Sequence, residues 1–223
     1  ALVAEAIGKA NAPDPWLEHG VLPVLLLERG GAADALDGVL AGETIATLAW
    51  TERGQRYSLK PTGMKAESTA EGFVLSGEKT MVMGALIADL FIVTADLGGE
   101  AACFLVPRDA PGLEVRAYRM ADGSIAGEVK LTRTPASAKL ALDAAALDAI
   151  AAEVRLLAAA EMVGLGQRLL DETLAYVKER EQFGVAIGSF QALQHRLVDC
   201  YAREEQARSM LYRAALTDRA DPA

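Results

Sequence analysis

The 223-residue sequence has few of the residues that build disulfide frameworks or metal centres. It contains two cysteines, Cys103 and Cys200, and two histidines, His19 and His195. The cysteines lie far apart and match neither a disulfide framework nor a metal-binding spacing, and two histidines argue against a multi-histidine metal site. So little cysteine fits a reducing compartment, and we predict a cytoplasmic location.

Long apolar runs and an excess of positive charge are also missing. The sequence has no run of eighteen apolar residues, which predicts that it does not span a membrane. Its formal net charge is −9 and its pI is near 4.8, which argues against nucleic acid and anionic membranes as partners. With 52% hydrophobic and 24% charged residues, the composition is that of an ordinary globular protein rather than a disordered one.

The two ends of the sequence predict a piece of a longer protein. The chain opens at Ala1 without an initiator methionine and without the basic start and apolar core of a signal peptide. It stops soon after a long amphipathic segment that should have a partner to pack against. We therefore expect missing segments at both ends.

Three zones of different periodicity divide the chain. Residues 1–43 have helical spacing that Pro13 and Pro15 interrupt. Residues 44–142 are short apolar runs separated by Gly and Asp turns, which is typical of an antiparallel sandwich or barrel. Residues 143–223 are helical again. The predicted fold class is α+β, mainly helical: an antiparallel β-sandwich or barrel domain between an N-terminal helical remnant and the first part of an up-down helical bundle.

The apolar runs and turn signals predict individual elements within these zones. Two short helices are expected at 22–28 and 33–40, and a long helix is expected to end near Arg180. A second long helix should begin near Ser189 as its N-cap and lie antiparallel to the first. The predicted strands are 45–50, 73–75, 90–95, 102–106, 113–116 and 127–131.

The most specific stretch is YVKEREQFGVAIGSFQALQH, at residues 176–195. It predicts a helix end, a short turn between glycines and a new helix. Arg180 and the N–H groups at the start of the new helix suit phosphate oxygens. Phe183 is able to stack on a planar base, and Gln191 offers a donor and an acceptor to a purine edge. The same spacing also fits a helical hairpin with ordinary surface charges and Phe183 as its hydrophobic plug.

This stretch resembles the R-x-x-F-G-x-x-I-G-x-F-Q pattern of the acyl-CoA dehydrogenase family. In that family the turn leaves its own subunit and binds the FAD of the neighbouring subunit. The resemblance implies that Arg180 binds the pyrophosphate, Phe183 lies on the adenine side and Gln191 contacts the adenosine. Residues 155–171, RLLAAAEMVGLGQRLLD, are similar to the family's helix that leads into this turn.

The family's middle domain is matched by shorter segments, with departures. Thr51-Glu52, Gly77-Glu78-Lys79 and Ala88-Asp89 resemble the domain in which a strand pair holds the flavin ring. By this resemblance Trp50, Thr51, Met81 and Met83 lie on the flavin side. Family members usually read K-x-W-I-T in the second strand, where the aromatic lies beside the ring and the Thr hydroxyl bonds flavin N5. Here methionine takes both places, and methionine fills space without donating a hydrogen bond.

The first flavin strand departs from the family pattern as well. Family members usually read T-E-P followed by a G-S-D turn, whereas residues 51–57 read T-E-R-G-Q-R-Y. This variant resembles the small subunits of bacterial two-subunit enzymes of the pimeloyl-CoA dehydrogenase type.

The family's reaction needs a carboxylate base that this sequence does not clearly supply. An α-proton leaves an acyl-CoA thioester and a β-hydride passes to flavin N5. The resemblance places the base beyond Ala223 or, in a minority of members, immediately before the position of Arg155, where this chain has Val154. Glu153 is one residue off and points about 100° away on a helix. Glu161 lies in an apolar stretch and is better explained as a paired structural carboxylate.

Three functions follow from the resemblance. The first is a catalytic FAD-dependent acyl-CoA dehydrogenase whose base lies outside the chain, with an electron-transfer flavoprotein or a similar acceptor and a homo- or hetero-oligomeric assembly. The second is a non-catalytic or half-site subunit that donates Arg180, Phe183 and Gln191 to a partner's FAD. The third is a relative with other flavin chemistry, such as an oxidase or monooxygenase. Arg155 is either a substrate-side residue or a solvated or ion-paired helix residue.

Overall fold

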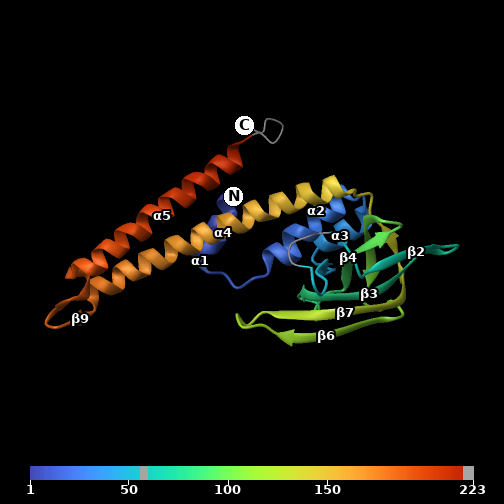
Figure 1. The fold of residues 1–223 in the computed structure, drawn as a ribbon, viewed down its shortest axis with the longest axis horizontal. Coiled ribbons are helices and arrows are strands. Elements are labelled where there is room, and N and C mark those ends of the chain that lie inside the picture. The colour runs from blue at the N-terminus through green and yellow to red at the C-terminus, as the bar shows by residue number, and fades with distance from the viewer. Residues whose placement is uncertain (56–59, 218–223) are drawn as a thin grey trace. The chain divides into compact units, whose positions relative to one another are not determined.

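The computed structural model describes residues 1–55 and 60–217, and the chain divides into two compact units (Figure 1). One unit is the continuous segment Pro15–Ala152, and the other combines Ala1–Asp14 with Glu153–Ala223. The helical residues from Pro15 to the first strand thus belong to the same unit as the sheet. One contact between them is the hydrogen bond of 3.0 Å between His19 Nδ1 and the Ala46 carbonyl. The predicted domain boundaries near residues 43 and 142 stay a prediction.

An eight-stranded sheet dominates the unit Pro15–Ala152, with the order β6-β7-β3-β2-β4-β5-β8 and β1 paired to β4. Long antiparallel pairs such as β3 with β7 and β4 with β5 build most of it. The strands are β1 (Ala46–Ala49), β2 (Lys65–Thr69), β3 (Gly72–Met83), β4 (Leu90–Leu97), β5 (Glu100–Pro107), β6 (Leu113–Arg119), β7 (Ile125–Ala136) and β8 (Ala138–Lys139).

The prediction of an all-antiparallel sheet is wrong for two strand pairs. Strand β1 runs parallel to β4, and β2 is parallel to β4 through the pair Lys65 and Asp96. All four residues of β1 are buried, so its apolar run lacks the alternation of a half-exposed antiparallel strand. Such a run reveals a buried strand without revealing the direction of its neighbour. The sheet is mixed, and the α+β class is confirmed.

Apolar side chains between the strands and three short helices form the core of this unit. The helices are the π-helix η1 (Trp16–Val21), α2 (Leu22–Arg29) and α3 (Ala33–Leu40), and the last two match the predicted positions. Gly84 fixes the packing of η1 against the end of β3, because a Cβ there would lie 1.9 Å from His19 Nε2. The largest buried apolar side chains of the sheet include Phe91, Phe104 and Leu131.

The second unit is a helical hairpin with one additional helix. Helix α4 (Ala144–Glu179) belongs to this unit from Glu153 onward and is followed by α5 (Gln191–Leu216). The two helices run antiparallel, as predicted. Close to the connection Gly188 packs on Val177, and far from it Arg208 Nη2 donates to Gln167 Oε1. Among the described residues of α5 only Leu211 is buried, so the predicted apolar face is largely left uncovered.

Helix α1 (Leu2–Ala10) packs on α4 through a pair of glycines. A Cβ at Gly8 would lie 1.9 Å from the Glu161 carbonyl oxygen, and a Cβ at Gly164 would lie 1.9 Å from the Glu5 carbonyl oxygen. The two backbones therefore approach as closely as they do only because neither position carries a side chain.

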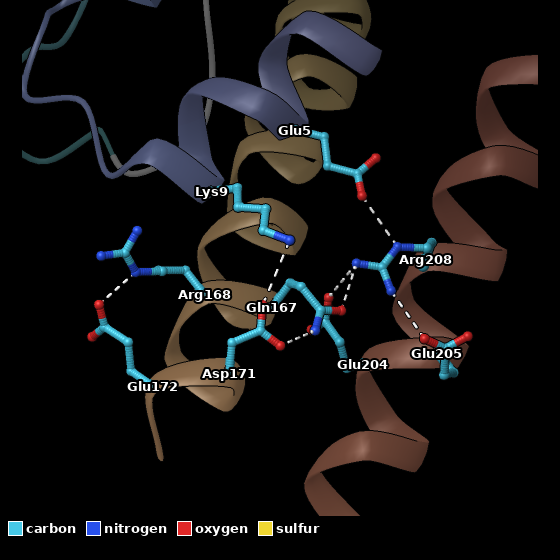
Figure 2. A network of polar contacts seen from close by, with 9 residues as sticks. All are labelled: Glu5, Lys9, Gln167, Arg168, Asp171, Glu172, Glu204, Glu205 and Arg208. Atoms are coloured by element: carbon cyan, nitrogen blue, oxygen red, sulfur yellow. Dashed lines mark hydrogen bonds and ion pairs between the residues drawn. The ribbon is translucent and has the colours of Figure 1, made fainter. Parts of the chain in front are cut away.

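A network of ion pairs and hydrogen bonds around Arg208 joins the three helices of this unit (Figure 2), with Gln167 as the hydrogen-bond partner on α4. The Arg208 guanidinium donates to Glu5 on α1 at 3.1 Å and to Glu204 and Glu205 on α5 at 3.2 and 3.0 Å. Lys9 adds a second link from α1, with its Nζ 3.5 Å from the Asp171 carboxylate on α4. Burial raises the pKa of Glu204, although Arg208 acts in the opposite direction. No helix in the described ranges is both long and apolar enough to cross a bilayer.

Candidate functional site

The tip of the α4–α5 hairpin is a two-residue turn whose first residue, Phe183, is unusual for its backbone conformation. Strands β9 (Glu181–Gln182) and β10 (Val185–Ala186) pair across it. Phe183 has φ 55° and Gly184 has φ 78°, so both central residues are left-handed, as a type I′ turn requires. Asparagine, aspartate and glycine are the usual first residues of such turns, since other L-residues are strained there.

The Phe183 side chain extends into solvent at this tip. It is 94% exposed, and its ring meets the edge of Phe190 with centroids 6.2 Å apart and planes at 72°. A large apolar ring in water at a strained position contributes little to the stability of the described chain. Such a feature is typical of a residue that serves a ligand or a partner.

Arg180 and the start of α5 flank the tip with donors. The Arg180 carbonyl accepts from the Ile187 N–H at 2.8 Å, which closes the base of the turn. Its guanidinium is exposed and has no hydrogen-bond or ion-pair partner elsewhere in residues 1–55 and 60–217. Gln191 is the exposed first residue of α5. The structure thus brings Arg180, Phe183 and Gln191 to one end of the hairpin.

The prediction of Ser189 as the N-cap of α5 is wrong. The Ser189 hydroxyl donates to the Ala186 carbonyl at 2.7 Å, because a 3₁₀ turn (Ile187–Ser189) precedes the helix. Phe190 is the N-cap and offers no side-chain acceptor. The Leu193 N–H already donates to the Phe190 carbonyl at 2.9 Å, whereas the N–H groups of Gln191 and Ala192 have no acceptor among the described residues. These two groups suit an external anionic oxygen.

An apolar groove of about 380 Å³ lies between α4 and α5 behind this tip. None of the three predicted ligand-binding residues lines it. Its lining is Leu174, Val177, Lys178, Ala186, Gly188, Gln194, Leu197 and Val198.

The predicted flavin-side residues of the sheet unit lie next to one another. The Thr80 N–H donates to the Thr51 carbonyl at 2.8 Å, which ties the segment after β1 to β3. The Thr47 hydroxyl donates to the Met83 carbonyl at 2.7 Å. Trp50 and Thr51 thus lie along the strand that carries Met81 and Met83, and their place on the flavin side stays a prediction.

Met81 lies on a bulge in β3. The pairing of β3 with β7 shifts register between Lys79 and Val82, and Met81 takes φ 52°. The Met81 side chain is 49% exposed, and its N–H donates to the Tyr118 hydroxyl at 3.2 Å. The bulge turns a flexible apolar side chain outward beside Trp50 and Thr51.

A buried ion pair lies directly beneath this surface. Lys79 is 0% exposed and Glu52 is 4% exposed, and the Lys79 ammonium donates to Glu52 Oε1 at 2.7 Å. The same ammonium donates to the Trp50 carbonyl at 3.1 Å and to the Thr94 hydroxyl at 3.0 Å, so all three N–H groups have acceptors.

The Glu52 carboxylate is equally well satisfied. Its Oε2 atom accepts from the Thr62 N–H and hydroxyl, both at 2.9 Å, and from the Gly63 N–H at 2.5 Å. Burial raises the pKa of Glu52, but the hydrogen bonds with Lys79, Gly63 and Thr62 outweigh it and hold the pKa at about 2. Burial lowers the pKa of Lys79, and Glu52 opposes that effect.

The pair itself was not predicted from the sequence. Glu52 and Lys79 stand in two of the short segments that resemble the middle domain, but both have polar neighbours in the sequence, such as Arg53 and Glu78. The neighbouring thiol of Cys103 is unsuited to nucleophilic chemistry, because burial raises its pKa to about 12. Arg56 and Tyr57 of the T-E-R-x-x-R-Y segment lie outside the described residues.

The candidate bases and Arg155 lie on α4. Glu153 and Glu161 are both partly exposed and both have interaction partners, so neither is a free carboxylate. The Glu161 carbonyl also contacts Gly8 where α1 crosses α4. Arg155 is exposed. The roles of these three residues stay predictions.

Comparison with known proteins identifies the family. Residues 47–133 match the acyl-CoA dehydrogenase middle domain and residues 144–223 match the acyl-CoA dehydrogenase C-terminal domain. The chain belongs to the acyl-CoA dehydrogenase family, as its motifs indicated.

The similar proteins are longer than this chain. An L-prolyl-[peptidyl-carrier protein] dehydrogenase from a Serratia species is 32% identical over 96% of this chain and 61% of its own length. The structure of PigA with FAD and proline has a TM-score of 0.86 at 29% identity, and the match covers 95% of this chain and 61% of the PigA chain. The ChsE4–ChsE5 complex from Mycobacterium tuberculosis has a TM-score of 0.81 at 29% identity, and the match covers 96% of this chain and 60% of the matched chain. The chain thus spans about 60% of these relatives.

Proposed function

We propose that the intact protein takes part in FAD-dependent α,β-dehydrogenation of an acyl-CoA thioester. Membership of the family supports the reaction class, and a structure of a similar protein, PigA, contains FAD. The observation that carries the proposal for this chain is the hairpin tip. It holds an aromatic ring 94% exposed at a strained position, a guanidinium that has no partner among the described residues, and a helix start without a side-chain cap.

The donor set of the tip fits a dinucleotide. Arg180 and the first N–H groups of α5 would hold the pyrophosphate, since both favour anionic oxygens. Phe183 would stack on the adenine, and Gln191 would bond the adenosine. FAD, when bound, supplies the hydride acceptor.

The sheet unit would receive the isoalloxazine ring. Trp50, Thr51, Met81 and Met83 form the surface proposed for it, in which two methionines offer apolar contact and no side-chain donor. Arg155 is proposed to lie on the substrate side. The carboxylate base is proposed to lie outside residues 1–223, because Glu153 and Glu161 already have partners.

A half-site subunit is the second candidate, and the two methionines favour it. A surface without the ring-side aromatic and the hydroxyl is the weaker half of a flavin site, whereas the hairpin tip keeps its full donor set. The ChsE4–ChsE5 complex shows that a similar protein assembles from two differently named chains. In this arrangement Arg180, Phe183 and Gln191 would serve the FAD of a different subunit, and an electron-transfer flavoprotein or similar acceptor would take the electrons.

Flavin stoichiometry of the intact protein tests both candidates. The protein is purified alone and with the product of a neighbouring dehydrogenase gene, and each sample is examined by absorbance and native mass measurement. One FAD per chain in a homo-oligomer supports an ordinary catalytic subunit, and one FAD per heterodimer supports the half-site subunit. Samples that stay colourless after incubation with FAD refute the proposal.

The electron acceptor and the thioester are tested with the yellow sample. Reduction of an artificial acceptor or an electron-transfer flavoprotein by acyl-CoA indicates a dehydrogenase. Oxygen consumption with peroxide or hydroxylated product would instead indicate an oxidase or monooxygenase. Acyl groups on CoA and on a carrier protein are compared, because the Serratia relative is named for a carrier-protein substrate.

A further inference from the structure

The buried cluster of Lys79, Glu52 and Thr94 lies beneath the backbone that the proposed flavin surface uses. Lys79 reaches the Trp50 carbonyl directly, and Glu52 reaches the chain on the other side of residues 53–61 through Thr62, Gly63 and the Met64 N–H, the last at 3.2 Å. One pair of side chains therefore fixes two separate backbone segments relative to β3.

Stability alone does not explain such a pair. Taking two charges out of water costs several kcal/mol per ion, and well-packed apolar residues in place of a buried pair are often neutral or stabilising. What an apolar replacement cannot do is to hold the Trp50 carbonyl and the Thr62 and Gly63 amides at fixed positions. The cluster is suited to defining a conformation rather than to raising the free energy of unfolding.

The conformation that it defines is that of the flavin-side surface. Lys79 is the last residue of β3 before the register shift, and the next two residues are Thr80, which donates to the Thr51 carbonyl, and Met81 with its left-handed backbone. A bulge with φ 52° at a methionine persists only where its surroundings hold it. The Lys79 anchor on one side and the Tyr118 hydroxyl on the other provide that restraint.

We infer that Lys79 is a positioning residue for the flavin, acting through the Trp50 carbonyl and the Glu52 carboxylate to hold Trp50, Thr51 and the Met81 bulge in the shape that receives the ring. This inference rests on the proposed function. Lys79 touches no ligand itself, since its side chain is fully buried. Removing it should leave a folded protein whose flavin surface is no longer preorganised.

The test uses the intact protein with FAD and the double variant Lys79→Met/Glu52→Gln, which removes both charges together. The matched control is Lys65→Met/Asp96→Asn, which removes an exposed ion pair of 2.5 Å from the same sheet. We expect the first variant to bind FAD at least tenfold more weakly and to shift the absorbance bands of bound flavin. The control should stay within twofold of the wild type with an unchanged spectrum.

A milder pair of variants covers the case in which the double variant fails to fold. Thr94→Val removes one acceptor of the Lys79 ammonium at nearly constant shape, and Thr94→Ser keeps the hydroxyl. Thr94→Val should weaken FAD binding and shift the flavin bands, and Thr94→Ser should restore both. Circular dichroism and thermal unfolding of the apoproteins show whether each variant is folded.

The outcomes separate this inference from the proposed function. A wild-type protein that binds no FAD refutes the proposed function. A wild type that binds FAD, with folded cluster variants whose affinity and spectrum equal the wild type's, overturns the inference alone. An unfolded double variant together with unchanged flavin properties in Thr94→Val also overturns it, because the cluster would then serve folding only.

Discussion

Replacing Phe183 by asparagine should preserve or slightly raise stability while it weakens FAD binding. An L-residue in the left-handed region costs about 1–2 kcal/mol, and asparagine is among the residues that tolerate this region best. The change also removes the edge contact between the Phe183 and Phe190 rings. Aromatic pairs contribute at least about 0.5 kcal/mol, and this lower value suits Phe183 because its ring is exposed to solvent. The free energy of unfolding should therefore rise by at most about 0.5–1.5 kcal/mol, because asparagine keeps part of the left-handed cost.

The effect of the same change on FAD should be larger and of opposite sign. Stacking of a base on an aromatic side chain is worth about 1–3 kcal/mol, so its loss should raise the dissociation constant about 5- to 150-fold. Urea unfolding of the apoprotein and fluorescence titration with FAD measure the two quantities separately. Val185→Thr, in the same hairpin, is the control and should change neither by more than about 0.5 kcal/mol.

One result would contradict this reasoning. If Phe183→Asn lowers the free energy of unfolding by more than about 1 kcal/mol and leaves FAD affinity unchanged, Phe183 is a hydrophobic plug of the hairpin. The strained turn would then be stabilised by the ring itself, and the aromatic would need no ligand to explain it.

Three further perturbations test other parts of the chain. Arg180→Ala should weaken FAD binding at least tenfold, since a charged hydrogen bond is worth about 1.5–3 kcal/mol. Arg196→Ala, on the exposed part of α5, should leave FAD binding unchanged. Titration of the folded variants with FAD measures both. The pKa of Glu52 is lowered from 4.5 to about 2, so its ionised form stabilises the fold above pH 4.5 and this contribution is lost as the pH falls toward 2. At about 1.4 kcal/mol per pKa unit the loss is about 3.5 kcal/mol. Urea unfolding at a series of acid pH values should show this loss in the wild type and not in Glu52→Gln. Gly164→Ala places a Cβ 1.9 Å from a carbonyl oxygen of α1 and should lower the free energy of unfolding by about 1–3 kcal/mol. The control Gly20→Ala, with nothing within 4 Å of its Cβ, should be nearly neutral. Equal effects of the two changes in thermal unfolding would contradict the close contact between the helices.

Helical elements and the hairpin tip were predictable because their signals are local. The glycines at 30 and 31 end a helix that begins after residue 21, and the turn between α4 and α5 is bounded by glycines. The short strand β2 was missed because its pattern is polar, with Ala66 its only buried residue.

Pairing and partners were not predictable because they join distant residues. The parallel neighbours of β4 depend on how the chain returns after β3, which no periodicity records. The Glu52–Lys79 pair spans 27 positions, and each residue alone resembles an ordinary surface charge. Ser189 failed as a cap because the geometry of the preceding turn, not the residue type, decides where α5 begins.

The glycine contact between α1 and α4 also sets an order of events during synthesis. Residues Pro15–Ala152 form a compact unit from one continuous segment, and they are able to fold as soon as they leave the ribosome. Helix α1 must wait for the middle of α4, because its Gly8 packs against the Glu161 carbonyl. A ribosome that stalls before Glu161 has emerged therefore holds a finished sheet together with an unpaired helix α1, whose apolar face is open to chaperones or to aggregation.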